Sequence, residues 1–122
     1  MRAFAAIALI SVLPILQACG ENCQSTCRHV YDASECGVVV PGVGPDELIK
    51  ECVSECEEAL KHVGTASYDP YQTPAAADNV ILANEAEAAA WIDCVWDLAP
   101  EPGPSEGCKN INPSERGVCA PI

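Results

Sequence analysis

The chain has 122 residues, nine of them cysteine, and its formal net charge at pH 7 is −12. Its six Lys and Arg residues are scattered, which excludes a phosphate-binding surface and therefore nucleic acid as a partner. The acidity instead favours solubility, repulsion from anionic surfaces, or a basic partner. The high cysteine content is typical of an exported protein, since disulfides persist mainly in oxidising compartments.

The N-terminus has the pattern of a secretory leader. Arg2 provides a basic start, and residues 3–16 form an apolar run without charge. This run is too short for a membrane-spanning helix, which needs about 20 apolar residues. The segment 16–19 reads Leu-Gln-Ala-Cys, which resembles the lipobox of bacterial lipoproteins. A plain secretory leader, with Cys19 as a disulfide partner or free thiol, is the alternative.

The lipoprotein resemblance implies how the chain is processed and where it goes. The leader 1–18 is removed, Cys19 receives a diacylglyceryl thioether, and its new amino group is acylated, for example with palmitate. The lipid then anchors residues 19–122, a single cysteine-rich domain, to the membrane. Gly20 after the lipidated cysteine favours the outer membrane of the cell envelope by the same analogy.

Cysteine parity supports lipidation independently. Assigning Cys19 to lipid leaves eight cysteines, an even number that can all form disulfides.

Removal of the leader also changes the net charge. Residues 1–18 contain one Arg and no acidic residue, so the charge of the mature chain becomes −13.

Periodicity and end signals predict three main helices in the exported domain. The first spans roughly residues 22–35, with Asn22 as its N-cap, and a loop covers 37–44. The second runs from Pro45 to about residue 63, and the third from Asn84 to Pro100. The signal for a short helix after Thr73 is weaker, and the tail beyond residue 100 is expected to be irregular. The fold class is therefore mainly α, a small disulfide-rich bundle of about three helices.

Two C-x3-C pairs predict how the first two helices are joined. Cys23 and Cys27 face one side of the first helix a turn apart, and Cys52 and Cys56 do the same on the second. An antiparallel hairpin pairs Cys23 with Cys56 and Cys27 with Cys52, whereas parallel helices would require the other pairing. The turn-rich connector favours the hairpin.

This layout resembles the twin C-x3-C helical hairpins of small mitochondrial import chaperones and plant hairpin protease inhibitors. The resemblance covers four cysteines and a topology, so it implies a fold and carries over neither family's activity. For the remaining cysteines, an up-down-up bundle favours Cys36 with Cys94 and Cys108 with Cys119. The rival pairings are Cys36–Cys119 with Cys94–Cys108, and the third permutation.

Sites of other chemistry are weighed against simpler interpretations. Four cysteines with His29 or His62 fit a zinc site, but export and even parity favour disulfides, and both histidines are predicted to lie on the surface. No serine stands in a nucleophile context, so we expect neither an enzyme nor a metal or other cofactor. Two further expectations concern acidic and aromatic residues. The carboxylates of Glu55, Glu57 and Glu58 are expected to form a solvated helix face. Of Trp91 and Trp96, one is expected in the core and the other partly exposed.

Together these features predict a lipid-anchored protein of the bacterial cell envelope that acts as a binding or structural module. Its contacts are the membrane, through the N-terminal lipid, and a protein partner that the sequence does not identify. The alternative is a protein inhibitor or toxin-like binder that presents the 37–44 loop.

Overall fold

The computed structural model describes residues 21–66, 69–71 and 82–119. Four helices form this part of the chain, and no strand occurs in it: α1 (Cys23–Tyr31), α2 (Pro45–Leu60), α3 (Glu85–Leu98) and α4 (Cys108–Ile111). The predicted mainly helical, disulfide-rich class is confirmed. The leader 1–18, Cys19 and the short helix expected after Thr73 lie outside the described residues.

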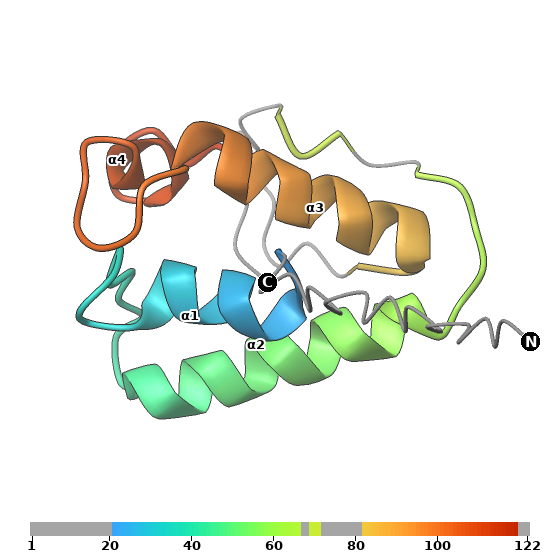
Figure 1. The fold of residues 1–122 in the computed structure, drawn as a ribbon. Coiled ribbons are helices and arrows are strands. Elements are labelled where there is room, and N and C mark those ends of the chain that lie inside the picture. The colour runs from blue at the N-terminus through green and yellow to red at the C-terminus, as the bar shows by residue number, and fades with distance from the viewer. Residues whose placement is uncertain (1–20, 67–68, 72–81, 120–122) are drawn as a thin grey trace, which may run out of the picture.

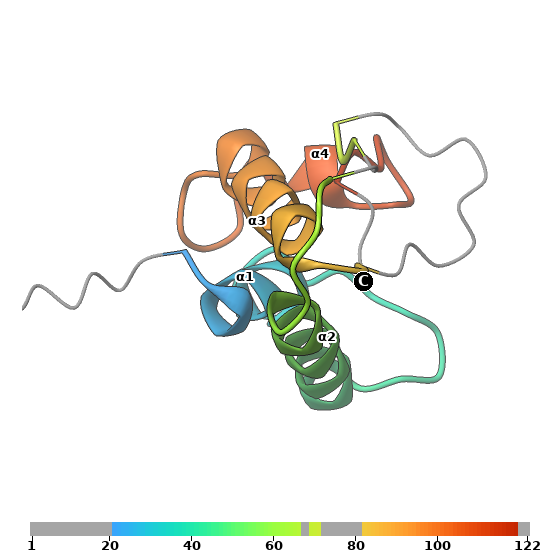
Figure 2. The same cartoon turned by 90° about the vertical axis from the view of Figure 1, so that its right-hand side faces the viewer.

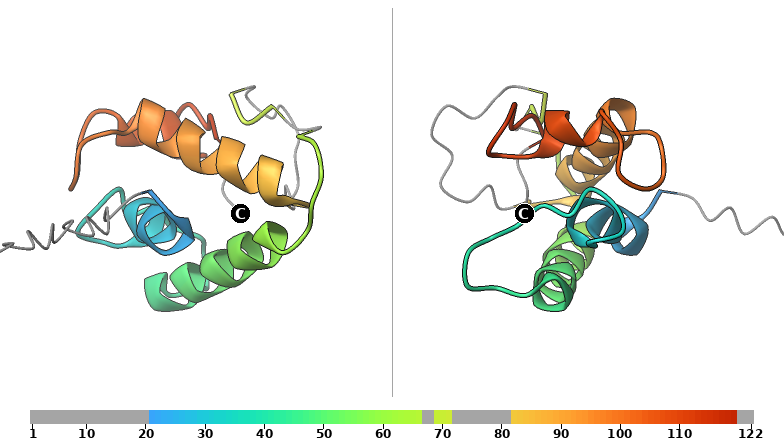
Figure 3. Two further views of the ribbon diagram at one scale, coloured as in Figure 1. Left: turned by 45° about the vertical axis from the view of Figure 1, so that its right-hand side comes forward. Right: turned by 90° about the vertical axis from the view of Figure 1, so that its left-hand side faces the viewer.

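The short helix α1 lies between the two long ones. In Figures 1 and 3, α2 packs along one side of α1 and α3 along the other. Figure 2 shows α4 beside α3, on the side of the molecule away from α2, while the α1–α2 loop arches outward. With neighbours on both sides, α1 buries six of its nine residues, and the polar side chains of Thr26 and His29 are among them.

Helix α1 begins as expected and ends four residues early. The Asn22 side chain accepts a hydrogen bond from Ser25 N at 2.9 Å, and the Ser25 hydroxyl accepts one from Asn22 N, which completes a capping box. After Tyr31, the Asp32 carboxylate accepts hydrogen bonds from the backbone N and hydroxyl of Ser34 at 2.9 and 2.7 Å. This local bonding replaces the next helical turn, because it ties the backbone into a turn instead.

Helix α2 has proline at its first position and acidic residues in its first turn, both of which suit a helix N-terminus. It ends at Leu60, three residues before the predicted end, and Lys61 is its C-cap.

Helix α3 closely follows its prediction. The Asn84 side chain accepts hydrogen bonds from Ala86 N and Glu87 N, both at 3.1 Å. The buried Glu87 carboxylate reaches back to Ala83 N at 2.8 Å, one residue further than in a capping box. The helix ends at Leu98 because Pro100 cannot continue it.

The hairpin disulfides are confirmed. Cys23 bonds Cys56 and Cys27 bonds Cys52, with Cα–Cα distances of 5.6 and 5.8 Å. All four cysteines are buried, so the two bridges form a covalent ladder in the interface between α1 and α2.

The preferred pairing of the other four cysteines is wrong. The bridges are Cys36–Cys108 and Cys94–Cys119, the third permutation, instead of Cys36–Cys94 and Cys108–Cys119. The reason is the segment after α3, which returns past the end of α1 and brings Cys108 to Cys36. The backbone N of Gly103 on this segment donates to Glu35, and the Cys119 backbone N donates to Pro70 O at 2.9 Å. The tail is thereby clamped at two points.

The core lies where α1, α2 and α3 meet. Trp91 is fully buried in it, together with Val30, Val95, Ile111 and six of the eight bridged cysteines. Among the described residues, no helix has the length and apolar character required to cross a bilayer.

Candidate binding surface

The loop between α1 and α2 contains a well-defined turn. Val43 N donates to Val40 O at 3.2 Å, and between them stand Pro41 and Gly42, the latter with φ +83°. Proline at the second position and a left-handed glycine at the third are the requirements of a type II turn. At the base of the loop, Val38 is buried and its backbone N donates to Val30 O at 2.9 Å. The loop is therefore held in shape at its tip and at its base.

The tip of the loop exposes apolar side chains. Val39 is 80% exposed and Val40 is 37% exposed. Beside them is an apolar hollow of about 240 Å³ between the loop and the start of α2, whose lining is Tyr31, Ala33, Gly37, Val38, Val39, Val43, Pro45 and Leu48. A single exposed valine needs no explanation, but exposed valines at the rim of an apolar hollow form a surface that a partner side chain can fill.

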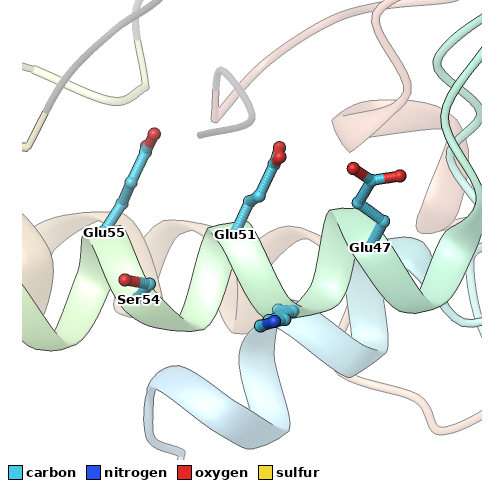
Figure 4. A pocket seen from close by; sticks show the side chains of 5 residues that line it. Glu47, Glu51, Ser54 and Glu55 are labelled. Carbon is cyan, nitrogen blue, oxygen red and sulfur yellow. The ribbon is translucent and has the colours of Figure 1, made fainter.

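A row of carboxylates runs along α2. Glu47, Glu51 and Glu55 follow one another at four-residue spacing, and in Figure 4 their side chains project to the same side of the helix. They border a second, polar hollow of about 580 Å³, which Lys50 and Ser54 also line. Within the described part of the chain, none of the three carboxylates has a cationic side chain within 4.0 Å. The row therefore has three carboxylates to the one Lys50 and keeps a net negative charge.

Tyr31 connects the apolar hollow with the acidic row. Its ring lines the hollow and is only 3% exposed. Burial, and then the charges of Glu55 and Glu51, raise the pKa of Tyr31 to about 12. Tyr31 thus lines the hollow and is within electrostatic range of the row. Both are built on the first turns of α2, which supplies Pro45 and Leu48 to the hollow and Glu47 and Glu51 to the row.

His29 lies inside the molecule, so its predicted surface position is wrong. It is 2% exposed, and its Nε2 lies 2.7 Å from Ala99 O while its Nδ1 lies 3.0 Å from the Glu35 carboxylate. The imidazole also stacks on Trp96, with ring centroids 4.3 Å apart. The helical pattern misses this network because α3 covers the side of α1 that a simple hairpin leaves open. The sequence contains no signal that α1 has a second packing neighbour.

The other candidate residues lie where the sequence predicts. The His62 side chain is 61% exposed, and its Nε2 lies 3.4 Å from Glu58. The carboxylates Glu55, Glu57 and Glu58 are all exposed on α2. Trp91 is core, whereas Trp96 is partly exposed and donates its Nε1–H to the Thr26 hydroxyl at 2.9 Å.

In the ranges 21–66, 69–71 and 82–119, no three His, Cys, Asp or Glu side chains are arranged to hold an ion. The four cysteine sulfurs that the zinc alternative would use are joined in two disulfides, Cys23–Cys56 and Cys27–Cys52.

Comparison with known proteins adds no relative. No protein-family model matches the sequence, and searches of curated proteins and of solved structures find no match. A function for this chain therefore has to be inferred from its own residues.

Proposed function

We propose that the chain is a lipid-anchored protein of the bacterial cell envelope that binds another protein through one surface. This binding surface consists of the loop 38–43 and the acidic row Glu47, Glu51 and Glu55. The observation that carries the proposal is the 80% exposure of Val39 beside an apolar hollow whose α2 residues, Pro45 and Leu48, flank the first carboxylate of the acidic row.

The position of this surface in the hairpin fits an anchored protein. Lipid on Cys19 would be attached four residues before Cys23, where α1 begins. The loop 38–43 follows the other end of α1, and a helix of nine residues is about 14 Å long. The domain would therefore stand on its lipid with the loop directed away from the membrane.

The charge of the surface indicates the chemistry of the partner. Three carboxylates against the single Lys50, on a mature chain of charge −13, attract a segment that carries Lys or Arg. The apolar hollow next to them accommodates an aliphatic or aromatic side chain of the same segment. Most of the affinity in such an interface comes from the apolar anchor, and the charges chiefly determine partner choice and association rate.

Binding is favoured over catalysis by the state of the two histidines. Both ring nitrogens of His29 are engaged inside the core, and His62 stands on an exposed helix end beside Glu58. Neither has the position of a general base next to a nucleophile.

Inhibition of a protease is the second candidate, and the type II turn at 40–43 is the observation that favours it. Inhibitors of this kind need a loop that is exposed and already held in its bound shape. Incubation with a panel of serine and cysteine proteases separates the two ideas. An inhibitor would block one of them with a tight, saturable dose response, which a Val39→Asp variant would lose.

Mass spectrometry of the unreduced chain isolated from membranes tests the anchor. The expected result is a mature N-terminus at Cys19 with a mass increase that corresponds to acyl chains, and a Cys19→Ala variant that is released from the membrane fraction. An unmodified Cys19 would contradict the lipid anchor and leave the binding surface to be judged by itself.

Site-specific photo-crosslinking in the native envelope tests the binding surface. A crosslinker at position 39 should give one discrete adduct, whereas one at exposed position 115 should not. Replacing Glu47, Glu51 and Glu55 with Gln should weaken the adduct, and the matched variant Glu57→Gln, which removes one exposed charge elsewhere on α2, should leave it unchanged. Equal adducts from positions 39 and 115, or none from 39, would count against this surface.

A further inference from the structure

One of the four disulfides differs from the others in its exposure. Cys36 and Cys108 are both partly exposed, whereas the six other bridged cysteines are between 0% and 3% exposed. Thiol–disulfide exchange requires a thiolate to reach a sulfur atom from outside. On access alone, Cys36–Cys108 is the bridge that an external thiol attacks first.

An imidazole stands beside this bridge inside the protein. His29 Nε2 lies 3.9 Å from Cys36 Sγ and 2.7 Å from Ala99 O. A carbonyl oxygen cannot donate a hydrogen bond, so Nε2 carries the proton and donates it to Ala99 O. A ring N–H group next to a sulfur stabilises the thiolate that forms there when the disulfide is cleaved.

The environment of Cys108 is different. Its sulfur lies 3.8 Å from the Ser105 hydroxyl and 3.9 Å from Gly103 O, both neutral groups. The imidazole therefore favours departure of the thiolate from Cys36 and attack on the sulfur of Cys108.

We propose that Cys36–Cys108 is a site of thiol–disulfide exchange, whose reductant is a dithiol outside the protein. One thiolate of the dithiol attacks Cys108 Sγ, the Cys36–Cys108 bond breaks, and Cys36 leaves as a thiolate beside His29. The second thiol of the reductant then attacks the reductant sulfur that is bonded to Cys108, which closes the reductant's own disulfide and releases Cys108. Two electrons and two protons pass to the cysteines, and the reductant becomes a disulfide.

Cleavage of this bridge would act on the loop 38–43. Cys36 stands two residues before Val38, and its bond to Cys108 fixes the base of the loop to the segment after α3. The three buried bridges would remain, so the bundle would stay folded while the base of the loop gained freedom. The consequence for partner binding rests on the proposed function, but the chemistry of the bridge does not.

The experiment exposes the unreduced mature protein to limiting dithiothreitol, followed by acid quenching, alkylation and peptide mapping over time. Cys36 and Cys108 should be alkylated first, at a rate at least about tenfold above that of any other pair. Earlier labelling of a buried pair, or simultaneous labelling of all eight cysteines, would overturn the proposal. The readout involves no partner, so its result is independent of whether the binding surface is correct.

Two sets of variants separate access from the role of the imidazole. His29→Gln replaces the imidazole with a shorter amide that withdraws the ring N–H from Cys36, and it should slow reduction of Cys36–Cys108 several-fold; an unchanged rate in the folded variant removes His29 from the proposal. If that variant does not fold, the order of alkylation in the unaltered protein still tests whether Cys36–Cys108 is the bridge that is reduced first. Cys36→Ser with Cys108→Ser should make the loop 38–43 cleavable by a protease. A loop as resistant as in the parent would refute the link to the loop.

Discussion

The imidazole of His29 lies face to face with the indole of Trp96, with ring centroids 4.3 Å apart and an interplanar angle of 10°. His29 belongs to α1 and Trp96 to α3, so the stack joins the disulfide-linked hairpin to the third helix. Next to it the Trp96 Nε1–H donates to Thr26, which is fully buried. Packing and hydrogen bonding thus perform between α1 and α3 the role that two disulfides perform between α1 and α2.

Replacing Trp96 with Phe tests this contact. The smaller ring still stacks but cannot donate to the Thr26 hydroxyl, whose buried oxygen loses a partner. We expect the free energy of unfolding to fall by about 1 to 2 kcal/mol, as measured by urea denaturation of the oxidised protein. Val63→Ala is the control, because Val63 is 89% exposed and its truncation should change stability by less than about 0.5 kcal/mol. Equal effects of both changes would refute the importance of the contact.

Stability should fall in alkali because of Tyr31. In the unfolded chain a tyrosine ionises near its ordinary pKa of 10, whereas burial, Glu55 and Glu51 raise the pKa of Tyr31 to about 12 in the folded protein. The folded state therefore holds this proton more tightly, and its contribution, complete below pH 10, is lost as the pH rises from 10 to 12. The loss amounts to about 2 to 3 kcal/mol by linkage. Denaturant unfolding at several pH values measures it.

The variants Tyr31→Phe and Tyr71→Phe distinguish the source of this alkaline effect. The first should abolish most of the loss between pH 10 and 12. Tyr71 also has its pKa raised to about 12, by its hydrogen bond to Asp97, but it is 46% exposed. Its replacement should alter the absorbance titration of phenolate with a much smaller effect on the pH profile of stability. An unchanged profile in Tyr31→Phe would contradict the assignment.

Loss of the Asn84 cap should destabilise α3. Asn84→Ala removes an acceptor for two backbone N–H groups and a donor to Thr65 O, so we expect a loss of about 1 to 2 kcal/mol. Asn84→Asp keeps the acceptor and should recover most of it. Gly64→Ala should harm the same cap indirectly, because a Cβ on Gly64 would lie only 2.7 to 2.9 Å from the Asn84 side chain. Thermal unfolding followed by circular dichroism compares all three variants.

Two substitutions in the loop should separate its effect on stability from its effect on binding. Gly42→Ala places a side chain at φ +83°, and nothing lies within 4 Å of the new Cβ, so the cost is backbone strain of about 1 kcal/mol. Val39→Asp changes an exposed side chain and should leave the melting temperature unaltered while abolishing the crosslink at the loop. A melting temperature that falls more for Val39→Asp than for Gly42→Ala would show that the loop is packed and not displayed.

Local signals predicted the helices and the ladder well. Asn22, Pro45 and Asn84 stand at or next to the helix starts, and the four-residue spacing of the cysteine pairs leaves an antiparallel hairpin one pairing. The end of α1 was missed because Asp32 satisfies Ser34 locally, an interaction that periodicity cannot weigh against another helical turn. These features depend on residues close together in the sequence.

The long-range features could not be deduced in this way. Pairing of Cys36 depends on where the segment after α3 returns, and the contact of Gly103 with Glu35 that marks this return joins residues 68 apart. The burial of His29 has the same origin, since its acceptor Ala99 is 70 residues away. Apolar periodicity identifies one covered side of a helix, but it does not show whether a second side is covered as well.

The bridge between Cys23 and Cys56 determines how mechanical load enters the domain. A pull on the residues before Cys23 reaches a covalent bond at the first residue of α1 and is passed directly to α2, the longest helix of the described chain. Unwinding of α1 from its exposed end, the easiest way to peel a short helix from a bundle, is blocked while that bond is intact. A domain tethered in this manner would withstand traction along its tether without opening its core.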